Sequence, residues 1–178
     1  MWTLIIVSIV AGALWIIGGK RTEYSTGLQI DSPTEKVFVH LTDPVHLKGW
    51  VEGLVEVGNL EPAEDNESSS RTKKTPRVIS VNGKEVRYDD EVLRFEKNES
   101  ISIQSSNSTI TVTSIFQLEP KGSETFLNYR VKKLNTGVGR FLAPIFGDKT
   151  QEKIEREIRK LKEQVESTTV QTGTELAQ

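Results

Sequence analysis

The chain has 178 residues, of which 35% are apolar and none is cysteine, and its formal net charge is −2. This near balance of charge predicts no nucleic-acid partner, because a nucleic-acid-binding face needs excess positive charge to displace counterions from phosphates. The lack of cysteine excludes disulfides, thiolate catalysis and cysteine–zinc sites.

The N-terminal segment is a continuous apolar run, because the first nineteen residues carry no charged side chain. At about 1.5 Å per residue, residues 2–19 form a helix of roughly 27 Å, close to the thickness of the hydrocarbon core of a bilayer. Trp2 and Trp15 lie towards its two ends, where indole rings favour the membrane interface. We therefore predict that residues 1–21 are a transmembrane anchor and that residues 2–19 contact the membrane.

Two other interpretations of this segment stay open. A cleaved signal peptide normally carries basic residues before its apolar run, and none precedes this one. A buried core helix is uncommon in a small domain when all its faces are apolar. Because Lys20 and Arg21 follow the run, the positive-inside rule predicts a single-pass membrane protein whose remaining domain lies in the cytoplasm.

Two short helices are predicted after a first strand over residues 24–30. Ser32-Pro33-Thr34-Glu35 is a capping-box pattern that predicts a helix through Leu41. Asp43-Pro44 again places an acidic cap before a proline, and predicts a second helix that ends near Trp50.

A meander of strands is predicted next, and Asn82-Gly83 gives its clearest signal, a two-residue hairpin turn. In the register of that turn Ile79 faces Val86, and Lys74 faces Glu91, which are favourable cross-strand pairs. The predicted strands cover residues 51–57, 71–81, 84–95, 101–105, 109–118 and 125–134, and a polar loop covers residues 61–70.

A long amphipathic helix is predicted near the C-terminus. Asp148-Lys149-Thr150-Gln151 has the pattern of a capping box, and the helix extends to about Ser167. Residues 168–178 are polar without periodicity, which predicts a disordered tail. The helix needs an apolar surface to cover its stripe, so we expect an α+β fold in which a curved antiparallel sheet of about six to seven strands grips it. The apolar stripe consists of Ile154, Ile158, Leu161 and Val165.

The opening of the domain carries a family resemblance. The run Leu28-Gln-Ile30-Asp-Ser-Pro33-Thr-Glu-Lys-Val37-Phe38, followed by Leu41-Thr42-Asp43-Pro44 and Trp50, resembles the polyketide cyclase/dehydrase group of the START, or Bet v 1-like (SRPBCC), superfamily. The resemblance covers the predicted domain of residues 22–167 and implies a helix-grip fold with an internal apolar cavity. Members mostly bind lipids, sterols, polyketides or other hydrophobic molecules, and some catalyse cyclisation or hydration. An N-terminal membrane helix departs from the common pattern.

Six aromatic residues lie on elements expected to face the interior. In a helix-grip domain such positions line the cavity, where tyrosine hydroxyls orient the polar end of a ligand, while simple core packing is the alternative. The candidate cavity residues are Trp50, Tyr88, Phe116, Tyr129, Phe141 and Phe146. Residues 137–147 hold three glycines and five bulky apolar residues. They predict either a hinged gate at the cavity mouth with a membrane-contacting lip, or a helical turn broken by Pro144 and packed into the core.

The polar residues nominate no catalytic residue, metal site or cofactor motif. His40 and His46 lack a surrounding set of acidic or cysteine ligands, so surface or capping roles are predicted for them. Asp89-Asp90-Glu91 faces basic residues that include Arg77 across the hairpin, which predicts a solvated surface.

We therefore expect a membrane-tethered binder or carrier of a hydrophobic small molecule. One alternative is an enzyme of the cyclase/dehydrase type, which requires a titratable cavity residue with a perturbed pKa. The other is an interaction module whose cavity is filled by side chains, and an interior packed solid would leave only that one.

Overall fold

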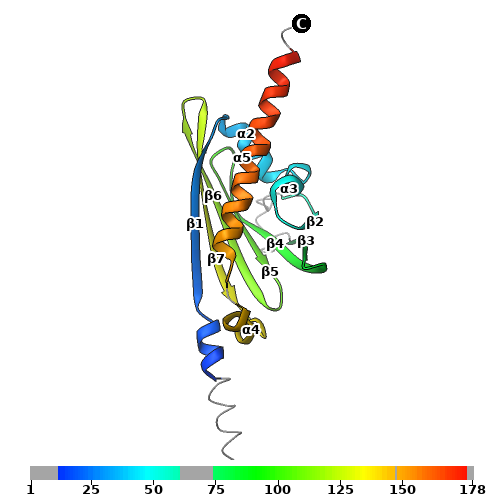
Figure 1. Ribbon diagram of the computed structural model, residues 1–178, viewed down its shortest axis with the longest axis vertical. Coiled ribbons are helices and arrows are strands. Elements are labelled where there is room, and N and C mark those ends of the chain that lie inside the picture. The colour runs from blue at the N-terminus through cyan, green and yellow to red at the C-terminus, as the bar shows by residue number, and fades with distance from the viewer. Residues whose placement is uncertain (1–11, 61–73, 147, 176–178) are drawn as a thin grey trace, which may run out of the picture.

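The computed structural model describes the backbone of residues 12–60, 74–146 and 148–175, and their side chains except those of residues 145–146 and 168–175. One antiparallel sheet and a set of helices make up this part of the chain (Figure 1). The elements are β1 (Arg21–Ile30), α2 (Thr34–Thr42), α3 (Pro44–Trp50), β2 (Leu54–Val57), β3 (Lys74–Val81), β4 (Lys84–Glu96), β5 (Ser100–Ser106), β6 (Ile110–Lys121), β7 (Glu124–Asn135), α4 (Gly139–Phe146) and α5 (Thr150–Glu175).

The sheet has seven strands in the order β1-β7-β6-β5-β4-β3-β2. The first strand therefore pairs with the last, and α2 and α3 connect the two edges of the sheet. Figure 1 shows α5 lying across one face of the sheet, with α2 and α3 near one end and α4 at the other. This arrangement confirms the α+β helix-grip architecture expected from the sequence.

The central hairpin has the register that its turn predicts. Asn82 and Gly83 have φ angles of 51° and 74°, which a type I′ turn requires at both central positions. Ile79 pairs with Val86, and Lys74 pairs with Glu91. The two-residue turn thus fixes which side chains of β3 and β4 share a face.

The predicted apolar stripe of α5 forms the centre of the core. Ile154 is 2% exposed, and Ile158, Leu161 and Val165 are fully buried. They pack against the inner face of the sheet and against buried residues of α2 and α3. Burying four aliphatic side chains stabilises the fold by roughly 6–12 kcal/mol before the entropy of ordering is subtracted.

The two ends of α5 differ from the sequence prediction. Asp148 Oδ1 accepts a hydrogen bond from the Thr150 backbone N–H at 2.9 Å, but the Gln151 side chain donates to the Ser25 carbonyl oxygen, so the reciprocal half of the capping box does not form. The helix continues to Glu175, so its predicted end at Ser167 was wrong. No proline follows Ser167 to stop it. Of the predicted tail, residues 176–178 lie outside the described residues.

The predicted caps of the two short helices have different outcomes. Asp43 Oδ1 accepts from the Val45 N–H at 2.7 Å, and α3 ends at Trp50, so this prediction is confirmed. The capping box at Ser32 was wrong, because Pro33 is the N-cap of α2 and no side chain caps the helix. Ser32 is buried, and its carbonyl oxygen accepts a hydrogen bond from Thr125 Oγ1 at 2.7 Å, which ties it to β7.

The strand predicted to begin at Val51 begins at Leu54. Val51 is the C-cap of α3, where its N–H donates to the Leu47 carbonyl oxygen, and Gly53 has a φ of 76° that turns the chain before β2. The predicted loop over residues 61–70 lies outside the described residues.

Residues 12–18 are helical and contact α4 just before β1. The Trp15 and Phe141 ring centroids are 5.0 Å apart, and the Arg140 guanidinium carbon lies 4.8 Å from the centroid of the Trp15 ring. A Cβ on Gly18 would meet the Arg140 carbonyl oxygen at 1.7 Å, so this close approach requires glycine. Much of the predicted anchor lies outside the described residues, and among the helices that are described none combines the length and apolar character needed to cross a bilayer.

Candidate ligand-binding cavity

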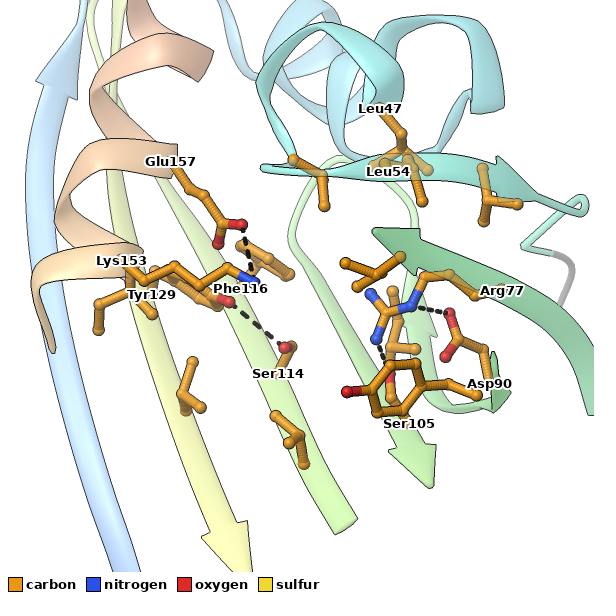
Figure 2. Close-up of a pocket in the computed structure, with 18 of the residues that line it drawn as sticks. Leu47, Leu54, Arg77, Asp90, Ser105, Ser114, Phe116, Tyr129, Lys153 and Glu157 are labelled. Carbon is orange, nitrogen blue, oxygen red and sulfur yellow. Dashed lines mark hydrogen bonds and ion pairs between the residues drawn. The ribbon is translucent and has the colours of Figure 1, made fainter. Parts of the chain in front are cut away.

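A cavity of about 210 Å³ lies between the inner face of the sheet and helices α3 and α5. Most of its wall is apolar, and Figure 2 shows Leu47 and Leu54 on one side, with polar groups projecting from two other sides. The interior is therefore not packed solid. This argues against the interaction module predicted as an alternative, because that module requires an interior filled by side chains.

Four of the six predicted aromatic residues line this cavity, namely Trp50, Tyr88, Phe116 and Tyr129. The Phe116 and Tyr129 rings stack with centroids 4.3 Å apart, and Trp50 meets Phe116 edge-on at 6.1 Å. These contacts build a rigid aromatic floor, because each ring is held by the next.

The other two predicted residues lie elsewhere. Phe141 packs against Trp15 at the far end of the molecule, and the Phe146 side chain lies outside the described residues. No described side chain of α4 is among those that line the cavity. The gate predicted for residues 137–147 therefore has no support from the described part of this segment.

A buried ion pair forms one polar wall of the cavity. Arg77 Nε lies 3.2 Å from Asp90 Oδ2, and Arg77 Nη2 donates a hydrogen bond to Ser105 Oγ (Figure 2). The Asp90 side chain is only 2% exposed and that of Arg77 21%. The solvated surface predicted for these two residues was therefore wrong, and we call this group the Arg77–Asp90–Ser105 cluster.

Burial governs the electrostatics of this cluster. Desolvation raises the pKa of the Asp90 carboxyl, while the charge of Arg77 and the nearby Ser105 hydroxyl oppose the rise. The Arg77 guanidinium carbon also lies 5.6 Å from the centroid of the Tyr88 ring, in cation–π range. Desolvation likewise raises the pKa of Tyr88. The Arg77 guanidinium, the Asp90 carboxyl and the neutral Tyr88 phenol therefore face the interior together.

A second polar wall comes from α5 and lies opposite the first in Figure 2. Glu157 is 5% exposed, and its Oε1 accepts a hydrogen bond from the Glu52 N–H at 3.0 Å. Lys153 Nζ lies 3.6 Å from the same oxygen. Burial raises the pKa of Glu157, against the opposing charge of Lys153.

The hydroxyl of Tyr129 belongs to this second wall and lies 3.4 Å from Ser114 Oγ. Burial raises the pKa of Tyr129 far above its ordinary value, and the charge of Glu157 adds to the rise. Tyr129 therefore keeps its proton at any physiological pH and offers a neutral hydroxyl.

A row of paired residues across the sheet explains why these polar groups meet. Asp90 pairs with Ser105, Ser105 with Val112, and Val112 with Lys133. Directly paired residues share a face, so all four project inward. Sequence reasoning missed this row although the inward position of Ile101 and Ile103 on β5 already implied that Ser105 follows them to the same face.

The two histidines differ from the sequence prediction. His40 is 2% exposed, so a surface role was wrong for it, and its ring stacks on that of His46 with centroids 4.1 Å apart. His40 Nδ1 lies 2.9 Å from the Lys36 carbonyl oxygen, and the Trp50 indole N–H donates to the His40 carbonyl oxygen at 2.9 Å. Desolvation lowers the pKa of His40. Among the residues with described positions, no group of three or more metal-ligating side chains comes together.

Comparison with known proteins identifies the fold. The model of a family described as polyketide cyclase / dehydrase and lipid transport matches residues 21–166. The comparison with curated proteins gives no match. The three solved structures described next are all under 25% identical to this chain, so their likeness shows the fold alone.

Three of these structures illustrate the likeness. Protein MLL2253 from Mesorhizobium loti is 20% identical with a TM-score of 0.61, and the match covers 83% of this chain and 98% of that one. TTHA0849 from Thermus thermophilus is 18% identical with a TM-score of 0.62, covering 83% and 99%. A START superfamily protein from Mycobacterium smegmatis is 14% identical with a TM-score of 0.61, covering 84% and 98%.

Proposed function

The chain belongs to the polyketide cyclase/dehydrase and lipid transport family, and from this premise we propose that its cavity binds a hydrophobic small molecule. The observation that carries the proposal is the cavity of about 210 Å³, with apolar and aromatic walls and a few polar groups. Such a composition is typical of small-molecule sites, in which apolar contact supplies affinity and polar groups fix orientation.

A cavity-filling variant tests this proposal. Val112 lines the cavity from β6, so Val112→Phe places a ring in the space that a guest would occupy. Thr113→Phe adds the same ring on the opposite face of the same strand and is the matched control. The full chain, kept in an amphipol, is titrated with the fluorescent hydrophobic probe N-phenyl-1-naphthylamine.

We expect Val112→Phe to weaken probe binding by about tenfold or more, because a lost apolar contact of about 1.4 kcal/mol already gives that factor. Thr113→Phe should bind like the wild type. Equal binding by all three proteins, after the signal of the amphipol alone is subtracted, would show that the probe sits outside the cavity and would refute the proposal.

We further propose that residues 2–19 tether the domain to a membrane and that the domain faces the cytoplasm. The run has no charged side chain, Lys20 and Arg21 follow it, and the described helical part exposes Trp15, Ile16 and Ile17 by 41%, 70% and 55%. A tether would hold the cavity near the lipid phase and raise the effective concentration of an apolar guest.

Alkaline carbonate extraction of membranes that contain the full chain tests the tether. The wild type should stay with the membrane pellet, and Ile9→Lys should shift it towards the supernatant, because lysine in the middle of a span costs about 2.5–3.5 kcal/mol. Thr22→Lys, just beyond the run, is the control. The chain has no cysteine, so a single Ser167→Cys, labelled by an impermeant maleimide only after permeabilisation, would report a cytoplasmic domain.

A second candidate function is acid–base catalysis in the same cavity. It is favoured by Asp90 and Glu157, two buried carboxyl groups on the cavity wall whose pKa values are raised by burial. An enzyme would lose turnover in Asp90→Asn or Glu157→Gln while still binding the hydrophobic probe. A carrier would show no turnover in any form.

A further inference from the structure

Every cation on the cavity wall has a carboxylate partner. Arg77 pairs with Asp90 at 3.2 Å and Lys153 with Glu157 at 3.6 Å. The third cation, Lys133, lies 2.9 Å from Asp148 Oδ2. The described wall therefore offers no cation whose charge is left uncompensated.

This pairing disfavours a charged guest. A carboxylate guest would find each cation already neutralised and would lie close to the buried carboxyl groups of Asp90 and Glu157. An ammonium guest would face Arg77 and Lys153 in the same way. Since moving any ion out of water is costly without a dedicated partner, both kinds of guest would bind weakly.

One buried acceptor on the wall is unsatisfied. Asp90 Oδ1 has no hydrogen-bond partner among the residues that the structure describes, although its side chain is only 2% exposed. Leaving such an acceptor unpaired costs free energy, and a donor supplied from the cavity would remove that cost. The Oδ2 atom is already held by Arg77, so the free lone pairs are those of Oδ1.

We propose that the cavity selects an uncharged amphiphile whose polar end carries a hydroxyl group, and that this hydroxyl donates a hydrogen bond to Asp90 Oδ1. The inference rests on the proposed function and names the chemical class of its guest. The Arg77 guanidinium then serves as a donor to the oxygen of that same group, and the Tyr129 hydroxyl on the opposite wall serves as a donor to a second polar group of the guest. The apolar tail lies against the aromatic floor and the leucines of Figure 2.

A series of four competitors with ten-carbon skeletons or their isomers tests the proposal on the wild-type full chain. Each one displaces N-phenyl-1-naphthylamine at pH 8. 1-Decanol and 1-methoxynonane are isomers that differ in whether the oxygen carries a hydrogen. Decanoate and decylamine carry opposite charges on a similar chain.

We expect 1-decanol to displace the probe at about a tenfold lower concentration than 1-methoxynonane, because hydrogen bonds to charged groups commonly give at least that factor. Decanoate and decylamine should be weaker than 1-decanol. Equal displacement by the alcohol and the ether, or stronger displacement by decanoate, would overturn the inference.

Asp90→Asn supplies an independent arm. It removes the charge that neutralises Arg77, so displacement by decanoate relative to 1-decanol should improve by about tenfold. Asp89→Asn removes one charge from the exposed neighbour on the other face and should leave the ratio unchanged. If Asp90→Asn fails to fold, the wild-type series still decides.

The outcomes also separate the two proposals. A wild type that does not bind the probe in the cavity contradicts the proposed function itself. A wild type that binds the probe but shows no preference for the alcohol contradicts only the hydroxyl-bearing class of guest.

Discussion

Removing Arg77 from its pair with Asp90 is expected to destabilise the protein in a pH-dependent way. In Arg77→Met the Asp90 carboxyl, only 2% exposed, loses the cation that lies 3.2 Å away. Breaking a buried pair commonly costs about 3–5 kcal/mol, and we expect about 3 kcal/mol here because Arg77 is itself partly exposed.

Protonation of Asp90 is a second way in which the variant can fold, because the neutral carboxyl leaves no unpaired charge buried. Relative to an ordinary aspartate, keeping the carboxyl neutral costs about 4 kcal/mol at pH 7 and about 1.5 kcal/mol at pH 5. The unpaired anion is therefore the cheaper state at pH 7, and the neutral acid is cheaper at pH 5. We expect Arg77→Met to lose about 3 kcal/mol of unfolding free energy at pH 7 and about half of that at pH 5.

The sign follows from linkage. Burial raises the pKa of Asp90 in the folded state above its unfolded value. Its protonated form is thus favoured by folding, and its contribution to stability is greatest below the unfolded pKa and falls as pH rises through the folded pKa. The charge of Arg77 lowers the Asp90 pKa, so Arg77→Met should raise that pKa further and make the fall in stability larger.

Urea unfolding of the full chain, followed by circular dichroism at both pH values, measures the effect. Asp90→Asn should cost less, about 1 kcal/mol, because the Arg77 side chain is 21% exposed and its charge can be hydrated. The double variant Arg77→Met/Asp90→Leu should recover to within about 1 kcal/mol of the wild type. A loss below about 1 kcal/mol for Arg77→Met at both pH values would mean that the pair is solvated, and the reasoning would be refuted.

Three further predictions concern the scaffold. Asp148→Asn keeps a capping residue but loses the charge near Lys133. Burial acts to raise the pKa of Asp148, but hydrogen bonds from Thr150, Tyr24 and Lys133 outweigh burial and lower that pKa. The variant should therefore lose about 1 kcal/mol at pH 7. The difference in Tm from the wild type should begin to shrink as pH falls below about 4, the ordinary pKa of aspartate, and should vanish only below the lowered pKa of the folded state; a constant difference would contradict this. Leu161→Ala should cost about 2–5 kcal/mol in urea unfolding because Leu161 is fully buried, against no more than about 0.5 kcal/mol for the exposed neighbour Lys160→Ala. Gly83→Val should cost about 1–2 kcal/mol through its φ of 74° alone, because a Cβ there meets nothing within 4 Å, and Gly83→Asn should cost clearly less; equal Tm values for the two would argue against a backbone cause.

Local signals in the sequence predicted much of the fold. The Asn82-Gly83 turn determined the register of β3 and β4, and the spacing of Ile154 and Ile158 identified the buried face of α5. Such signals depend on neighbouring residues alone, so no knowledge of the tertiary structure is needed. The failure at Ser32 has the opposite origin, because a contact with β7 decides its conformation.

The polar walls of the cavity depended on long-range register that the sequence does not show. The pairing of β4 with β5 shifts between Val92 and Arg94, so Val92 and Phe95 pair with inward residues of β5 although an odd number of positions separates them. Simple alternation of inward and outward residues through β4 therefore cannot predict toward which face of the sheet Asp90 projects. The aromatic residues were easier to place, because a large apolar side chain is buried whatever its exact neighbours are. Trp50, Phe116 and Tyr129 are all buried.

The pairing of β1 with β7 has a consequence for how the chain acquires its structure. Arg21 pairs with Leu134 and Ile30 with Thr125. During synthesis β1 therefore cannot pair in the sheet until β7 has been made. Contacts this distant in sequence make closure slow, and they leave one edge of the growing sheet unpaired throughout translation. Charged residues on an unpaired strand disfavour pairing with other chains, and β1 carries Arg21 and Glu23. A nascent chain stalled before Leu134 should accordingly remain open to proteases, whereas release of β7 should complete the sheet in a single step.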